Sequence, residues 1–309
     1  MRKIIRIGTR ESQLALWQAT QVKDLLAQQD FESELVFIKS EGDIDLVTPL
    51  YEIGVQGIFT RSLDAALLNN RIDVAVHSLK DVPTQLPNGI LQAAVLQRGP
   101  VNDLLVFKNK DAQEKYAVGD TRFTVATSSI RRKAQWLNRF SRSVIYNLRG
   151  NVNTRLRKLQ DEKWDAAIFA QAGLERIGLR PSTSVVLEWM LPAPAQGAIV
   201  VVCRNDDTFS MKACRYFNHT ETEICTKIER DFLRKLLGGC STPISALAEF
   251  KNEKIFFKGN ILSLDGSRKV EIEKSVDGQE ANELGKLAAE ELLRKGGEEI
   301  AEHFRHATK

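Results

Sequence analysis

"IDVAVHS", residues 72–78, is an apolar run that ends in polar side chains, and the chain continues as "LKDVP", residues 79–83. Such a run is typical of a strand that is covered on both faces of a parallel sheet. The preceding residues, 58–70, have helical spacing, and a helix before such a strand is the pattern of an α/β layer. We therefore expect an α/β fold in which the polar residues lie just beyond the carboxyl end of this strand.

The residues before this strand alternate between strand and helix patterns. We expect strands at residues 3–8 and 34–40 and helices at residues 12–28 and 58–70. Residues 41–57 form a long glycine-bearing loop, and loops of that length are usually functional or mobile. This loop is our candidate for a lid.

A second alternating series follows. We expect strands at residues 123–129, 143–148 and 165–170, with helices at 130–140, 151–162 and 172–179. Another apolar strand is expected at residues 196–204, placed so that it is able to return to the first sheet. The C-terminal pattern differs, with a helix at 220–238, strands at 244–250, 254–264 and 269–276, and a helix at 281–295. That order predicts a small α+β module.

The expected fold class is α/β: two periplasmic-binding-protein-like α/β domains flanking a cleft, plus a small C-terminal α+β domain. The expected domain boundaries are 1–98 with 197–215 for domain 1, 99–196 for domain 2 and 216–309 for domain 3. A chain of 309 residues is long enough for two or three domains.

Side chains that bind anions recur after three of the expected strands. They are Ser78, Lys80 and Asp81; then Thr127, Ser128, Ser129, Arg131 and Arg132; then Arg149, Gly150, Asn151 and Arg155. Helix N-termini favour negative charge, and guanidinium groups match carboxylates or phosphates. Because ligands of such sheets bind beyond the carboxyl ends of the strands, this recurrence predicts a cleft for an anion with several acidic arms.

Each of these features also has a simpler interpretation. Ser78 is able to cap a turn, Asp81 before Val-Pro is able to close one, and His77 alone is better read as a satisfied core histidine. Taken in isolation, the segment at residues 131–142 is better interpreted as a solvated basic helix face. Recurrence at three strand ends is what favours the functional interpretation.

Composition excludes several classes of protein. The net charge of +4 is small for a general nucleic-acid binder, which usually has a broad basic face. We expect no signal peptide, because charged residues interrupt the N-terminal apolar run, and no membrane-spanning segment. The four cysteines contain no Cys-x-x-Cys pair, so we expect neither a zinc site nor any other metal site, and we expect a cytoplasmic protein with reduced thiols.

Cys240 stands apart from the other cysteines. It lies in "LLGGCSTPI", residues 236–244, after two glycines, whereas Cys203 lies inside an apolar run. A thiol in a glycine turn suggests a nucleophile or an attachment point, although a neutral turn residue is an equally open interpretation at this stage.

Together these segments resemble the porphobilinogen deaminase family over essentially the whole chain. The segments that carry the resemblance are "IGTRESQLALWQA" (7–19), "AVHSLKDVP" (75–83), "TSSIRRKAQ" (127–135), "LRGNVNTRLRKL" (148–159), "DAAIFAQAGLERIGL" (165–179), "LPAPAQGA" (191–198) and "LLGGCSTPI" (236–244). The resemblance implies a transferase of tetrapyrrole (heme) biosynthesis. Such an enzyme condenses four porphobilinogen molecules into 1-hydroxymethylbilane, with release of ammonia, on a dipyrromethane cofactor held by a thioether.

The resemblance also implies a role for individual residues. Asp81 matches the catalytic carboxylate, and Cys240 matches the cysteine that carries the dipyrromethane. The other implied cofactor-binding residues are Ser78, Lys80, Thr127, Ser128, Ser129, Arg131, Arg132 and Gly150. The implied substrate-binding residues are Arg10, Ser12, Arg149, Arg155, Arg176 and Gln196. This agrees with the residues themselves, since a growing polycarboxylate chain needs many cations and a developing pyrrole cation needs one fixed carboxylate. We expect His77 to be structural.

The sequence departs from the family pattern at a few positions. Gln56 stands where a lysine is usual, which puts one loop contact to substrate in doubt, while Arg61 keeps a basic residue nearby. "QRGPVND", residues 97–103, replaces a more acidic stretch and is expected to alter the hinge between the first two domains. Ala126 and Ala195 replace glycines.

Two other functions stay open at this point. The first is a two-lobed anion-binding module without catalysis, which would not explain Cys240. The second is a nucleic-acid binder that uses the basic segment at residues 131–142. By resemblance we expect a monomer whose partner is porphobilinogen and which passes its product to the next pathway enzyme, with no nucleic-acid or membrane partner.

Overall fold

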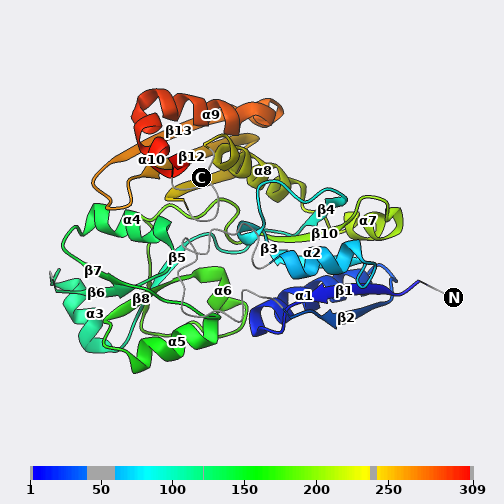
Figure 1. Ribbon diagram of the computed structural model, residues 1–309, viewed down its shortest axis with the longest axis horizontal. Coiled ribbons are helices and arrows are strands. Elements are labelled where there is room, and N and C mark those ends of the chain that lie inside the picture. The colour runs from blue at the N-terminus through cyan, green and yellow to red at the C-terminus, as the bar shows by residue number, and fades with distance from the viewer. Residues whose placement is uncertain (1–2, 40–59, 121, 237–241, 307–309) are drawn as a thin grey trace. The chain divides into compact units, whose positions relative to one another are not determined.

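The computed structural model describes residues 3–39, 60–120, 122–236 and 242–306 (Figure 1). The chain divides into two compact units. The first unit consists of Met1–Leu46, Val55–Gly99 and Gly197–Ile224, and the second of Val47–Gly54, Pro100–Gln196 and Cys225–Lys309. The predicted boundary of a separate third domain at residue 216 stays a prediction.

The first unit contains a five-stranded sheet with the order β2-β1-β3-β10-β4. Its strands are β1 (Ile5–Thr9), β2 (Ser33–Phe37), β3 (Val74–Ser78), β4 (Ile90–Val95) and β10 (Ile199–Arg204). β1 is parallel to β2 and β3, whereas β10 is antiparallel to β3 and β4. Its helical segments are α1 (Gln13–Ala27), α2 (Arg61–Leu68), the 3-10 turn η2 (Leu79–Asp81) and α7 (Thr208–Arg215). The expected return of the strand near residue 200 to the first sheet is therefore confirmed.

The second unit repeats this arrangement with the order β7-β6-β8-β5-β9. Its strands are β5 (Asp103–Phe107), β6 (Thr124–Ala126), β7 (Val144–Tyr146), β8 (Ala166–Ala170) and β9 (Ser184–Val186). β6 is parallel to β7 and β8, and β5 is antiparallel to β8 and β9. The accompanying helices are α3 (Lys110–Ala117), α4 (Ile130–Arg139), α5 (Val152–Asp161) and α6 (Gln171–Glu175).

The C-terminal part is a three-stranded antiparallel sheet with helices. The sheet has the order β11-β12-β13. Its elements are α8 (Thr220–Lys235), β11 (Ile244–Lys251), β12 (Lys254–Leu262), β13 (Lys269–Asp277), η3 (Gly278–Glu283), α9 (Leu284–Leu292), η4 (Leu293–Gly297) and α10 (Glu298–His306). The turn after β12 packs on α4, where Asn138 Nδ2 donates to the Gly266 carbonyl at 2.8 Å. The predicted fold class, two α/β sheets and a small C-terminal α+β module, is confirmed.

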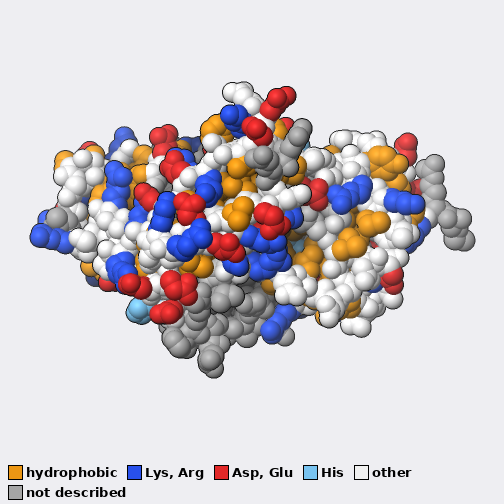
Figure 2. All heavy atoms as spheres, turned by 90° about the horizontal axis from the view of Figure 1, so that it is seen from above, with side chains coloured by type: hydrophobic (Ala, Val, Ile, Leu, Met, Phe, Trp, Pro, Cys, Tyr) orange, Lys and Arg blue, Asp and Glu red, His pale blue; other side chains and the backbone are white. Residues whose placement is uncertain are grey.

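On the face that Figure 2 shows, Lys and Arg side chains are interspersed with Asp and Glu side chains. The viewed face therefore gives no sign of the broad basic surface typical of nucleic-acid binders.

None of the described helices is long and apolar enough to cross a membrane.

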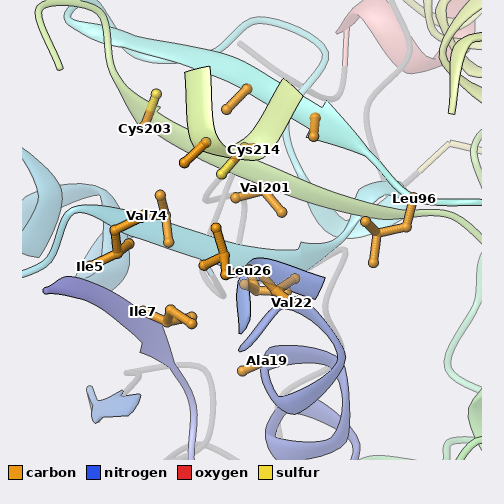
Figure 3. Packing of buried hydrophobic residues seen from close by; sticks show 14 of the residues in the cluster. Ile5, Ile7, Ala19, Val22, Leu26, Val74, Leu96, Val201, Cys203 and Cys214 are labelled. Atoms are coloured by element: carbon orange, nitrogen blue, oxygen red, sulfur yellow. The ribbon is translucent and has the colours of Figure 1, made fainter. Parts of the chain in front are cut away.

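The core of the first unit explains why its elements form where they do (Figure 3). Ile5 and Ile7 of β1 and Val74 of β3 face Val22 and Leu26 of α1, and all five are fully buried. Period-two alternation on the strands and helical spacing on α1 bring these side chains to one interface. Burying one such side chain contributes about 1.5–3 kcal/mol, so this interface is what holds β1, β3 and α1 together.

Some elements differ from the prediction. β4, β5 and β9 were not predicted, because no helix separates β4 from β5 and β9 has only three residues. α3, α7 and α10 were not predicted either. α6 ends at Glu175, earlier than the predicted residue 179, because the backbone turns at Gly178, where φ is +66°.

Candidate active site

The carboxyl ends of β1 and β3 lie side by side in the first unit. The two strands are parallel neighbours, with Ile7 opposite Val74 and Gly8 opposite Ala75. The order β2-β1-β3 places a topological switch point between β1 and β3, which is where open α/β sheets bind ligands.

A small pocket of about 80 Å³ opens at this switch point. Four of the predicted site residues line it: Arg10, Ser12, Ser78 and Asp81. Arg10 and Ser12 follow β1, whereas Ser78 ends β3 and Asp81 ends the turn η2. Lys80, in the same turn and half-buried, is not among the described residues that line the pocket. The structure thus brings a carboxylate and an arginine together where the sequence predicted them.

The N-terminus of α1 forms one wall of this pocket. Ser12 is its N-cap and accepts a hydrogen bond from the Ala15 backbone N–H at 3.3 Å. Both residues line the pocket, and the first turn of α1 contains no acidic residue. Helix N-termini attract anions through their free N–H groups and the macrodipole, so this wall favours a carboxylate.

Two polar residues complete the described lining near β3. Gln18 of α1 donates to the Ser78 hydroxyl at 2.8 Å, which fixes the end of β3 against α1. His77 also lines the pocket and is only 6% exposed. Burial, together with the positive charge of Arg10, lowers the pKa of His77 to about 4, so its imidazole is neutral at neutral pH.

The carboxyl ends of β6 and β7, in the second unit, form the second edge at which the sequence predicts anion-binding residues. Ser128, after β6, holds the end of β7, because its hydroxyl lies 2.5 Å from the Leu148 carbonyl and accepts from the Leu148 N–H at 2.9 Å. Ser129 is the N-cap of α4, and its N–H donates to the Thr127 hydroxyl at 3.2 Å. Ser128 is therefore mainly a link between strand ends, and Ser129 with Thr127 shapes the start of α4.

The turn after β7 leads into α5. Gly150 has φ +113°, and a Cβ at this position would lie 2.7 Å from the Thr154 side chain, so only glycine fits. Asn151 caps α5 by accepting from the Thr154 N–H at 2.9 Å. Arg155 Nε donates to the Gly150 carbonyl at 2.7 Å, while Arg149 is only 2% exposed. No acidic residue lies in the first turn of α4 or α5, so both N-termini suit carboxylates.

Arg131 and Arg132 belong to a buried ion cluster around Asp103. The Asp103 carboxylate is fully buried and accepts from Arg131 Nη2 at 2.6 Å and from Arg132 Nη2 at 2.7 Å. Burial opposes the ionisation of Asp103, but the two guanidinium groups hold its pKa well below the usual range. The interpretation of this segment as a solvated basic face is wrong for Arg131 and Arg132, which are 4% and 6% exposed.

Gln196 lies in the same cluster. It is 1% exposed, and its Nε2 donates to Asp103 Oδ1 at 2.9 Å and to the Val101 carbonyl at 2.7 Å. These bonds make Gln196 a support for Asp103, and its predicted contact with substrate stays a prediction. No sequence pattern indicated Asp103 as the partner of both arginines.

Arg176 lies at the C-terminal end of α6, after β8. Burial lowers its pKa to about 10. Arg176 is half-buried, and a nearby anion favours the charged form of a partly desolvated guanidinium, which suits the predicted contact to a carboxylate arm.

The described cysteines are poor candidates for covalent attachment. Cys203, Cys214 and Cys225 are all buried, and burial raises the pKa of Cys203 to about 11 and raises that of Cys214 further. A thiol with a raised pKa is a weak nucleophile. Cys240, Gln56 and the candidate lid at residues 41–57 lie outside the described residues.

Comparison with known proteins adds independent evidence. The model "Porphobilinogen deaminase, dipyromethane cofactor binding domain" matches residues 5–212, and "Porphobilinogen deaminase, C-terminal domain" matches residues 223–294. A curated protein of Desulforamulus reducens named porphobilinogen deaminase is 39% identical in an alignment that covers 99% of this chain and 99% of that protein.

Solved structures show a more distant similarity. The VFT2 domain of Bordetella pertussis BvgS is 12% identical, with a TM-score of 0.41, over 68% of this chain and 84% of that chain. The probable amino-acid transporter extracellular-binding protein ytmK of Bacillus subtilis is 13% identical, with a TM-score of 0.40, over 70% of this chain and 92% of that chain. The family models and the curated relative, by contrast, cover nearly the whole sequence. On that evidence this chain belongs to the porphobilinogen deaminase family.

Proposed function

We propose that the protein is a hydroxymethylbilane synthase of tetrapyrrole (heme) biosynthesis. It condenses four porphobilinogen molecules head to tail into 1-hydroxymethylbilane and releases one ammonia for each addition. The observation that carries this proposal is the pocket at the β1–β3 switch point, which unites Asp81 with Arg10 and the N-terminus of α1. Porphobilinogen has two carboxylate arms and a reacting centre that becomes cationic. The pocket offers a positive group, Arg10, to match a carboxylate and a negative group, Asp81, to match the cationic centre.

Asp81 stabilises the charge that develops during each addition. When the bond between the methylene carbon and the protonated amine of porphobilinogen breaks, the nitrogen leaves as ammonia with the bonding electrons, and the pyrrole ring delocalises the positive charge left on the methylene carbon. A carboxylate fixed beside this centre, hydrogen-bonded to the pyrrole N–H, lowers the energy of the transition state. Asp81 lies on the short turn η2 directly after β3, which gives it a defined position in the pocket.

The cations and helix N-termini hold the acidic arms. In the first unit these groups are Arg10, Ser12 and Lys80, and in the second unit they are Arg149, Arg155, Arg176 and the capped N-termini of α4 and α5. Their number suits a chain that gains two carboxylates with each addition. Arg131 and Arg132 contribute from within the Asp103 cluster, because one carboxylate cannot neutralise two guanidinium groups.

The dipyrromethane fits the donor set of this chain. Its acidic arms match N-termini that carry no acidic first-turn residue and are capped by Ser129 and Asn151. When bound, it supplies the free pyrrole carbon at which the chain grows. We propose Cys240 as its attachment point, since Cys203, Cys214 and Cys225 are buried.

The remaining parts of the proposal rest on family membership. We infer a monomer in the cytoplasm that passes its product to the next enzyme of the pathway. The alternative of an anion-binding module without catalysis is not favoured, because the family model that matches residues 5–212 is a cofactor-binding domain of an enzyme family.

Incubation of the purified protein with porphobilinogen tests this function. We expect stoichiometric release of ammonia and formation of 1-hydroxymethylbilane. Asp81→Asn keeps the shape of the side chain but removes its charge, and loss of one such stabilising group typically lowers the rate roughly 100-fold to 1000-fold. Porphobilinogen binding should survive in this variant. Near-normal turnover by Asp81→Asn would show that the assigned role is wrong.

A further inference from the structure

His77 lines the Asp81 pocket but has no role in the function proposed above. His77 is only 6% exposed, and its buried Nε2 has no hydrogen-bond partner among the residues that the structure describes. An unsatisfied buried polar atom costs roughly 1–3 kcal/mol, and such groups are rare in folded proteins. His77 is therefore not the satisfied core histidine that the sequence suggested.

The surroundings of His77 suit an anion. The same pocket is lined by Arg10 and by the first turn of α1, through Ser12 and Ala15. Arg10 acts on His77 through its charge, so the two side chains share one electrostatic environment. The positive charge of Arg10 would repel a cationic group of a ligand. Asp81 is the acidic residue of the described lining. The pocket therefore has a positive part, suited to a carboxylate, and a negative part at Asp81.

We propose that His77 is a substrate-positioning residue whose Nε2–H donates a hydrogen bond to the carboxylate that Arg10 binds. This inference rests on the proposed function, and the carboxylate belongs to a porphobilinogen unit, either the incoming molecule or the primer. A neutral imidazole suits this role because it adds a directed donor without a second positive charge. Another cation in this pocket would oppose the positive charge that develops next to Asp81.

The proposal predicts opposite effects on stability and on binding. His77→Phe keeps an aromatic ring of similar size and removes the unsatisfied nitrogen, so the variant should melt at a temperature equal to or above that of the wild type. It also removes the donor, and a hydrogen bond to a charged group is worth roughly a 10-fold to 100-fold change in affinity. His77→Gln places an amide N–H near the position of Nε2 and should recover most of the loss.

The test is steady-state kinetics with porphobilinogen, combined with intact mass and thermal unfolding of each variant. If the carboxylate is that of the incoming substrate, His77→Phe raises KM about 10-fold or more with kcat within about twofold and full cofactor loading. If it is that of the primer, His77→Phe instead lowers cofactor loading, seen by mass. In both cases His77→Phe in an Arg10→Gln background should add little, since both residues bind the same carboxylate.

His219→Phe is the matched control. His219 Nδ1 accepts from the Thr222 N–H at 3.2 Å near the start of α8, so this substitution should lower the melting temperature and leave KM unchanged. The inference is overturned if His77→Phe leaves both KM and loading unchanged, or if it destabilises the protein as His219→Phe does. Failure of the proposed function would be separate, because the wild type itself would then not convert porphobilinogen.

Discussion

The substitution Asp103→Asn removes the charge at the centre of the buried cluster in the second unit. Asp103 is fully buried and accepts from Arg131, Arg132 and Gln196 at 2.6, 2.7 and 2.9 Å. Asparagine has nearly the same shape, but it offers one oxygen and a donor that faces the guanidinium groups. The variant therefore leaves two buried cations without their counter-charge.

The magnitude follows from the burial of both partners. Removal of one partner of a buried ion pair costs about 3–5 kcal/mol, because the remaining charge is left uncompensated in a low dielectric. The total stability of a domain is only about 5–15 kcal/mol, so Asp103→Asn should remove a large fraction of it. The start of α4 should loosen first, since both arginines lie in its first turns.

Urea unfolding at neutral pH, followed by far-UV circular dichroism, measures this effect. A matched control is Asp120→Asn, whose partner Arg122 has a side chain that is 90% exposed. This variant should leave the unfolding midpoint unchanged, because exposed ion pairs contribute little. A loss of less than about 1 kcal/mol in Asp103→Asn would contradict the reasoning, because a buried charge so removed should cost several times more.

Two further predictions concern His77, in the pocket of the first unit, and Gly266, in the turn after β12. Folding lowers the pKa of His77 from 6.5 to about 4. Between these two pH values the unfolded chain binds more protons than the folded protein, so the free energy of unfolding falls as the pH falls. Thermal unfolding at pH 5 should therefore show a loss of about 2 kcal/mol relative to pH 7.5, and His77→Phe should abolish this loss. An unchanged pH dependence in His77→Phe would assign the loss to other groups. Gly266 has φ +72°, and a Cβ at this position would lie 2.5 Å from the Ala134 carbonyl oxygen and from the Asn138 backbone nitrogen of α4. Gly119 has a similar φ of +70°, but nothing lies within 4 Å of a Cβ there. Gly266→Ala should therefore lower the melting temperature clearly more than Gly119→Ala. Equal shifts in the two variants would mean that the turn does not depend on this close approach.

Much of the fold was predictable because its signal is local. The apolar run at residues 72–78, the helical spacing before it and the later alternation of strand and helix patterns predicted parallel strands, and β1, β3, β6 and β8 lie in that arrangement. β4 and β5 were missed because they follow one another without an intervening helix, so they lack the local alternation of strand and helix that marks the parallel strands.

The site was predictable for the same reason, but only in part. The rule that ligands bind at the carboxyl ends of parallel strands predicted Asp81, whereas Arg10, which lines the same pocket, was implied only by the family resemblance. Asp103 was not predicted as the partner of Arg131 and Arg132, because three-dimensional packing decides which carboxylate reaches two buried guanidinium groups. The same holds for His77, whose unsatisfied nitrogen is visible only in the structure.

Intact mass spectrometry of the purified protein tests the central claim most directly. If the chain builds hydroxymethylbilane on a tethered primer, the wild type is heavier than its sequence by one dipyrromethane. Cys240→Ser should match the mass of its sequence, while Cys225→Ser, which changes a buried thiol, should keep the excess. A wild type without added mass, or a Cys240→Ser variant that retains it, would contradict the account.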